Sequence, residues 1–297
     1  MILSTAIEFP NLHISIDNLP KSISIFGIDI AFYGCIIAVG MLAGIAIACL
    51  EARRTGQDYN QYIDFAIYAI LFSVIGARAY YVIFKWDYYS EHLSEIINIR
   101  EGGLAIYGGV IMAIVTCFIY TKIKKMSFLK VCDTAILGLI AGQIIGRWGN
   151  FFNREAFGGV AGDTNPWAMR IYFDENYSIS QVPEVVKSGM ETLRGSTLSE
   201  IGYIQVQPTF LYESLWNIFV LILMLIFRDK KKFDGEVILW YLIGYGIGRA
   251  VIEGMRTDQL IMPVTGWPVS QALSIVVAAT SLIIVIIKRI TIKKIKN

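Results

Sequence analysis

Charged side chains are scarce in this chain: Asp, Glu, Lys and Arg make up only 17% of its 297 residues, while hydrophobic residues make up 55%. Such a composition excludes an intrinsically disordered chain, a collagen and a coiled coil. The 26 basic and 24 acidic residues leave a net charge of +2, which gives no support for nucleic-acid binding. The mean hydropathy of +0.56, together with apolar runs about as long as a bilayer core is thick, indicates an integral membrane protein.

Cysteine and histidine are also few, which bears on cross-links and metals. The cysteines lie in or at the edge of apolar runs, so we expect no structural disulfide among Cys35, Cys49, Cys117 and Cys132. His13 and His92 have no second histidine or cysteine at metal-ligand spacing, so we expect neither a metal site nor a cofactor. The first 27 residues lack a basic start and a compact apolar stretch, so we do not expect a cleaved signal peptide.

Seven apolar runs are suited to spanning helices, at 28–50, 61–84, 104–121, 133–152, 209–227, 236–253 and 269–287. Their orientation follows from the connections, because cytoplasmic loops carry an excess of Lys and Arg. One set of connections holds fifteen basic residues: Arg53, Arg54, Lys122, Lys124, Lys125, Lys130, Arg228, Lys230, Lys231, Lys232, Lys288, Arg289, Lys293, Lys294 and Lys296. The opposite set holds only Lys21, Lys85, Arg100 and Arg256. We therefore predict an all-α integral membrane protein of seven transmembrane helices, with the N-terminus outside and the C-terminus cytoplasmic.

One outer connection differs from the rest, because it runs for about 55 residues from Asn153 to Gln207 and mixes Gly, Pro, Asp, Glu and Tyr. Loops of this length are usually functional or carry structure of their own, so we expect a small external cap domain. The predicted organisation is an external arm at 1–27, helices one to four within 28–152, the cap at 153–207, helices five to seven within 208–288, and a basic cytoplasmic tail at 289–297.

Three arginines lie inside predicted spans, namely Arg78, Arg147 and Arg249. Each costs roughly 2.5–3.5 kcal/mol at a helix centre, and such residues usually face a bundle interior. In the predicted topology each lies about four to six residues before the outer end of its helix, which is roughly 6–9 Å below the outer boundary. Three guanidinium groups at one depth predict a shared cavity.

The neighbouring spans bring further polar groups to the same depth, because Tyr33, Tyr107 and Glu213 each lie near the outer end of a helix that runs inward. The alternative is that the arginines snorkel to the interface, or pair with Glu155, Glu213 and Glu253 only to hold helices together. A cavity with surplus positive charge is suited to phosphate, because the guanidinium fork matches its oxygens. We therefore predict an anionic phospholipid headgroup of the outer leaflet as the ligand.

The run Gly146-Arg147-Trp148-Gly149-Asn150-Phe151-Phe152-Asn153-Arg154-Glu155-Ala156-Phe157-Gly158 resembles the signature of the prolipoprotein diacylglyceryl transferase family, Gly-Arg-x-Gly-Asn-Phe-x-Asn-x-Glu-x-x-Gly, at all eight specified positions. Other segments resemble the family in the same order, namely 32–34, 76–81, 102–109, 207–213 and 249–256. One departure from the family is Tyr107, where many members have a histidine to which a base-like role is assigned.

The resemblance implies a bacterial enzyme of the plasma membrane, multi-pass and with its active site toward the outer leaflet. It would transfer the diacylglyceryl group of phosphatidylglycerol to the lipobox cysteine of prolipoprotein signal peptides, releasing glycerol phosphate, in the first step of lipoprotein maturation. By position, the substrate-binding residues would be Tyr33, Arg78, Tyr81, Arg147, Asn150, Asn153, Glu213, Arg249, Glu253 and Arg256. We expect the catalytic residues to be Arg147, Arg249, Tyr107, Asn150 and Glu155.

Two other classes of protein would also place arginines in a membrane cavity. One is an organic-anion transporter, which we would expect to show internal repeats or broken helices near the midplane. The other is a non-enzymatic protein that binds anionic lipid, including an inactive relative in which Tyr107 replaces the histidine. An intramembrane protease is disfavoured, because no span holds a histidine or a pair of mid-membrane aspartates.

Overall fold

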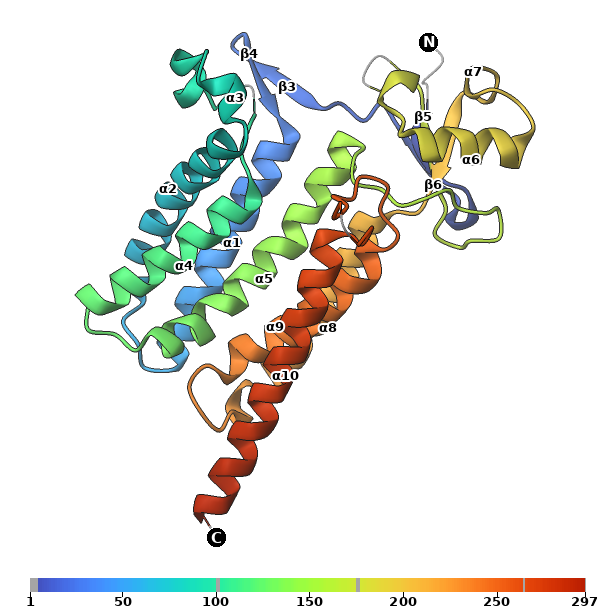
Figure 1. The fold of residues 1–297 in the computed structure, drawn as a ribbon. Coiled ribbons are helices and arrows are strands. Elements are labelled where there is room, and N and C mark those ends of the chain that lie inside the picture. Colours follow the sequence, from blue (N-terminus) through green and yellow to red (C-terminus); the bar gives the residue numbers. More distant parts are fainter. Residues whose placement is uncertain (1–4, 100–101, 175–176, 264, 297) are drawn as a thin grey trace. The chain divides into compact units, whose positions relative to one another are not determined.

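The computed structural model describes residues 5–99, 102–174, 177–263 and 265–296, and it is mostly helical (Figure 1). The chain forms two compact units, which are described separately. The first contains residues 1–44, 139–232 and 239–297, and the second contains residues 45–138 and 233–238. Arg100, one of the outer basic residues of the orientation argument, lies outside the described residues.

Within the described ranges, six helices are long and apolar enough to cross a membrane. They are α1 (Phe32–Arg54), α2 (Tyr59–Phe84), α4 (Ile106–Ile123), α5 (Phe128–Asn153), α8 (Thr209–Phe227, prolonged by the 3-10 turn η4, Arg228–Lys230) and α10 (Val269–Lys296). The helix α9 (Glu236–Glu253) corresponds to the remaining predicted span, and it carries Glu236, Arg249 and Glu253 among its 18 residues. A helical membrane protein is therefore confirmed, whereas the seventh span stays a prediction.

Two helix boundaries differ by several residues from the predicted ranges. Residues 28–31, placed at the start of the first span, form the strand β4 (Ile28–Ala31), which pairs antiparallel with β3 (Ser22–Ile25), so that α1 begins at Phe32. The tail at 289–297 is helical through Lys296, because α10 continues past the apolar run with no Gly or Pro to end it.

The N-terminal arm and the segment 153–207, predicted as separate parts, share one antiparallel sheet of order β2-β1-β5-β6. Its strands are β1 (Thr5–Phe9), β2 (Ile14–Asp17), β5 (Met169–Tyr172) and β6 (Tyr203–Val206). The segment between β5 and β6 forms the helices α6 (Glu184–Arg194) and α7 (Leu198–Ile201). We call the described residues within 5–19 and 157–207, which contain these six elements, the sheet subdomain. Outside its spans the membrane protein is therefore not all-α.

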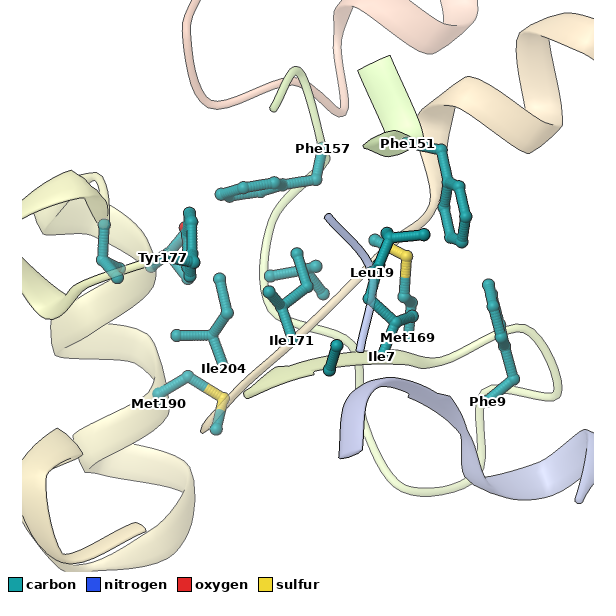
Figure 2. Close-up of a cluster of buried hydrophobic side chains, with 14 of the residues drawn as sticks. Ile7, Phe9, Leu19, Phe151, Phe157, Met169, Ile171, Tyr177, Met190 and Ile204 are labelled. Carbon is teal, nitrogen blue, oxygen red and sulfur yellow. The ribbon is translucent and has the colours of Figure 1, made fainter. Parts of the chain in front are cut away.

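Alternate residues of the strands fill the core of the sheet subdomain. Ile7, Ile171 and Ile204 are fully buried, and Met190 of α6 covers them (Figure 2). Phe151, from the last turns of α5, and Phe157, from the segment after it, belong to the same cluster. Burial of a large apolar side chain contributes roughly 1.5–3 kcal/mol, so these two residues fix the chain on both sides of 152–156.

The second unit is built on the pair α2 and α4. A Cβ added to Gly108 would lie 2.3 Å from the Gly76 oxygen, so the two backbones can approach this closely only with glycine. After α2 come the short helices α3 (Trp86–Tyr89) and η2 (Leu93–Ile97).

Asp133 of α5 accepts hydrogen bonds from the backbone N–H groups of Gly235 (2.9 Å) and Ile238 (3.0 Å), and it thereby caps the start of α9.

Candidate active site

Two of the intramembrane arginines meet at a single carboxylate of the first unit. Arg147 of α5 pairs through Nη2 with Oε2 of Glu213 on α8, and Arg249 of α9 pairs through Nη1 with the other oxygen, Oε1, at 3.0 Å. The Nη2 atom of Arg249 also lies 2.6 Å from Oε2 of Glu253, one turn further along α9. Three helices are therefore joined by one chain of ion pairs.

Arg256 lies at the end of this chain of ion pairs. It is 4.0 Å from both Glu213 and Glu253, and it makes a bidentate pair with Asp258, from Nε to Oδ1 at 2.9 Å and from Nη2 to Oδ2 at 2.7 Å. Burial opposes the charge of both partners, but their mutual hydrogen bonds outweigh it, so the pKa of Arg256 is raised and the pKa of Asp258 is lowered. Asp258 was not predicted from the sequence, although its spacing of two residues from Arg256 was a usable signal.

We call Arg147, Glu213, Arg249, Glu253, Arg256 and Asp258 the ion-pair network. The side chains of Arg147 and Arg249 remain 19% and 15% exposed, whereas those of Glu213 and Glu253 are only 5% and 4% exposed. In the pairs with Glu213 and Glu253 the guanidinium groups are therefore the more accessible partners, whereas the Asp258 side chain is 47% exposed. The surplus of positive charge predicted from the sequence is not found in this network, because three acidic residues, including the unforeseen Asp258, balance its three arginines.

A second polar cluster lies at the end of α5, a few residues after Arg147 in the sequence. The side-chain amides of Asn150 and Asn153 donate to the same oxygen of Glu155, Oε1, at 3.0 and 3.2 Å. The helix ends here, with the Glu155 N–H bonded to the Asn150 carbonyl at 3.1 Å. Tyr33 lies close by, since a Cβ added to Gly149 would lie 2.8 Å from its ring.

Backbone hydrogen bonds hold the segment that follows. Gly158 donates to the Gln207 carbonyl and Gly159 to the Met255 carbonyl, each at 2.9 Å. A Cβ at Gly158 would lie 3.0 Å from both the Gln207 Cβ and the Met255 oxygen, which explains the glycine at this signature position. The signature segment is thereby tied to the chain just before α8 and just after α9.

Arg78, Tyr81 and Tyr107 lie in the second unit, so their convergence with the ion-pair network stays a prediction. Arg78 is 8% exposed and donates to the backbone carbonyls of Glu95, Ile96, Gly102 and Gly103 at 2.6 to 3.2 Å. The Tyr81 and Tyr89 rings lie 5.9 and 5.0 Å from its guanidinium carbon. Tyr107 lies in the first turn of α4, as predicted for the opening of the third span.

Ionised side chains gathered among apolar helices define the class of this protein as a helical membrane protein with a polar, arginine-bearing site. The family follows from comparison with known proteins. Residues 20–287 match the model of the prolipoprotein diacylglyceryl transferase family, and the chain belongs to that family.

Curated relatives of the chain carry the name phosphatidylglycerol–prolipoprotein diacylglyceryl transferase. The one from Clostridioides difficile (strain 630) is 44% identical over 240 residues, which cover 80% of this chain and 84% of the relative. The one from Finegoldia magna is 41% identical over 263 residues, or 88% and 92% of the two chains. The one from Listeria innocua is 41% identical over 271 residues, or 91% and 90%.

Proposed function

We propose that the protein transfers the diacylglyceryl group of phosphatidylglycerol to the cysteine thiol of a prolipoprotein lipobox, releasing glycerol phosphate. One observation carries this proposal. Arg147 and Arg249 each pair with a different oxygen of the Glu213 carboxylate, and both guanidinium groups remain partly accessible. The relatives' names point to the same substrates.

The two arginines are suited to the phosphate of the lipid. A guanidinium group binds phosphate oxygens through a planar fork, and such bonds are strong in a site that excludes water. Glu213 pairs with both arginines and Glu253 pairs with Arg249, so the guanidinium groups are oriented before the lipid arrives. We assign Arg147 and Arg249 to the phosphate, and Arg256 to support of the same carboxylates.

The transfer step replaces a carbon–oxygen bond by a carbon–sulfur bond. The thiolate attacks the glyceryl carbon next to the phosphate, and glycerol phosphate leaves with the bonding electrons. A free thiol has a pKa near 8.5, so only a few per cent is ionised at neutral pH, and the guanidinium groups favour ionisation. The thiol proton is released to water or to the departing phosphate, whose second negative charge the fixed arginines stabilise.

The remaining signature residues fit supporting roles. Asn150, Asn153 and Glu155 form a hydrogen-bonded set that can receive the glycerol hydroxyls of the headgroup. Tyr33 and Tyr81 are assigned to contacts with the lipid. We assign Tyr107 a hydrogen bond to the lipid rather than the role of a general base.

Arg78, predicted from the sequence to bind the substrate, fits a supporting role better. Four backbone carbonyls already accept hydrogen bonds from its guanidinium group, so binding of a phosphate would have to displace them. We propose that Arg78 supports the site by holding the segment from Glu95 to Gly103 ahead of Tyr107, and that its contact with the lipid is indirect.

The proposed arrangement in the membrane has seven spans, with α9 as the sixth. A charged helix is tolerated there because Arg249 and Glu253 face each other and Glu213 rather than lipid. The excess of basic residues in alternate connections supports an N-terminus outside and a C-terminus in the cytoplasm. The sheet subdomain is then an external cap, and the site opens to the outer leaflet of the bacterial plasma membrane.

The direct test is to incubate the purified protein with phosphatidylglycerol vesicles and a lipobox peptide, and to weigh the peptide by mass spectrometry. We expect a gain equal to one diacylglyceryl group, no gain when serine replaces the peptide's cysteine, and no gain with phosphatidylcholine alone. An unmodified peptide under the first condition would contradict the proposal. Anion flux in sealed vesicles without peptide modification would favour a transporter instead.

A further inference from the structure

Arg154 is one of the five residues of the signature run that the family pattern leaves unspecified, and it is the most deeply buried charge of that run. Its side chain is 0% exposed and belongs to the first unit. The Nη1 atom lies 2.7 Å from Oδ1 of Asp174, and Nη2 donates to the Leu19 carbonyl at 3.0 Å. A buried charge is costly unless it is paired, so this side chain is firmly held by its partners.

The backbone at Arg154 has an unusual conformation. Arg154 and Ala156 both have φ = 55°, in the left-handed region that favours glycine, and they flank Glu155 on either side. Such conformations persist only where the surroundings impose them. Here the Arg154 side chain is anchored on one side of the turn, and the Thr209 hydroxyl donates to the Ala156 carbonyl on the other.

The turn directs Glu155 and Arg154 to different partners. Glu155 is exposed, and its carboxylate accepts from Asn150 and Asn153, whereas Arg154 reaches Asp174 at the end of β5. Asp174 is itself fixed, since its Oδ1 accepts from the Tyr177 N–H at 2.9 Å. The position of the Glu155 carboxylate therefore depends on an anchor in the sheet subdomain.

We propose that Arg154 is a positioning residue for the transfer reaction, which acts by holding the turn 153–156 so that Glu155 faces Asn150 and Asn153. The inference rests on the proposed function, which gives Glu155 its role in the site. It adds that Arg154 holds Glu155 in position. It also gives the sheet subdomain a defined task, because Leu19 and Asp174 supply the anchor.

The test is a double-mutant cycle of Arg154→Met and Glu155→Gln, measured as the initial rate of peptide modification in phosphatidylglycerol vesicles. We expect Arg154→Met to lower the rate about 10–100-fold, as is typical for partners that orient a site residue. In the Glu155→Gln background the same change should have almost no further effect, because its target is already lost. Arg154→Lys should restore part of the rate through Asp174.

A matched control is Arg194→Met, which removes another arginine–aspartate pair of the sheet subdomain, with Asp163 at 2.6 Å. This variant should keep the full rate. Equal losses from Arg154→Met in both backgrounds, or an equal loss from the control, would overturn the inference, because the effect would then be general destabilisation.

A second measurement needs no turnover. The Arg154 and Glu155 N–H groups donate to the Phe151 and Asn150 carbonyls, each at 3.1 Å, so hydrogen exchange reports whether the turn is held. Arg154→Met should speed exchange at these two amides, and Arg194→Met should not. Unchanged exchange would refute the anchoring, whereas a failure of the unaltered protein to modify peptide would count against the proposed function alone.

Discussion

Replacing Arg147 by lysine separates the two roles that an intramembrane arginine can have. If Arg147 serves only to hold α5 against α8, a lysine ammonium can take its place opposite Glu213, since that contact is made by one nitrogen atom. If it also binds phosphate, lysine fails, because a single ammonium group cannot present a second, fixed pair of donors to the lipid.

The size of the expected loss follows from the contacts. Arg147 uses Nη2 for Glu213 and remains 19% exposed, so the rest of the fork is available to the phosphate. Removing one fixed donor from a developing negative charge costs about 2.7–4 kcal/mol, or about 10²–10³ in rate. We expect Arg147→Lys to lose about that much activity and Arg147→Ala to be nearly inactive.

The assay compares initial rates of peptide modification in phosphatidylglycerol vesicles with the melting temperature of the same variants in detergent. We expect Arg147→Lys to melt within a few degrees of the unaltered protein, because Glu213 keeps two cationic neighbours. Arg194→Lys in the sheet subdomain serves as the control and should be fully active. An active Arg147→Lys variant would refute phosphate recognition by this residue and would favour a purely structural ion pair.

Three further changes probe other parts of the chain. Tyr107→Phe should lower the rate only about 2–10-fold, the value of one hydrogen bond, and a variant as inactive as Arg147→Ala would show that the hydroxyl has a larger role. Asp133→Ala should lower the free energy of unfolding by about 1–3 kcal/mol in denaturant titrations, because it removes the cap of α9. Asp133→Asn should lower it less, and equal losses of stability in the two variants would rule out the cap. Hydrogen bonds from Arg194 and Gln205 hold the pKa of Asp163 below its usual range, so its stabilisation is complete above about pH 4 and is lost as the pH falls further. The melting temperature of Asp163→Asn should therefore be lower than that of the unaltered protein at neutral pH, and the two should converge in acid. A difference in melting temperature that stays constant with pH would contradict this.

The meeting of Arg147 with Arg249 could be predicted from the sequence, because charge inside an apolar run is costly and forces a shared interior. Depth along a helix follows from counting residues, and both arginines were counted to the same depth. The partner was less certain: Glu213 was one of three acidic candidates, and the structure shows that it serves both arginines. The ion-pair network itself carries no surplus of positive charge, because Asp258, which lies outside every apolar run and was not considered, balances the third arginine. The predicted surplus, which also counted Arg78, stays a prediction.

The sheet subdomain could not be predicted from the pattern of apolar residues. Its strands are four or five residues long and belong to segments more than 150 residues apart, such as Ile7 opposite Ile171. Pairing over this distance leaves no local signal, and the single register of the strands comes from the shared core. For the same reason the role of Arg154 could not be predicted, since its partners Leu19 and Asp174 are not near it in sequence.

A balanced ion-pair network serves transfer better than the predicted surplus of positive charge. Three unpaired arginines in a bundle would repel one another and would need to rearrange when a phosphate arrived. With Glu213 between Arg147 and Arg249, both guanidinium groups are fixed in advance, and both side chains remain partly exposed. The lipid brings one negative charge, and the departing phosphate gains a second. Because the guanidinium groups are already oriented, that gain is stabilised without reorganisation, which is the condition for a lower barrier rather than only tighter binding.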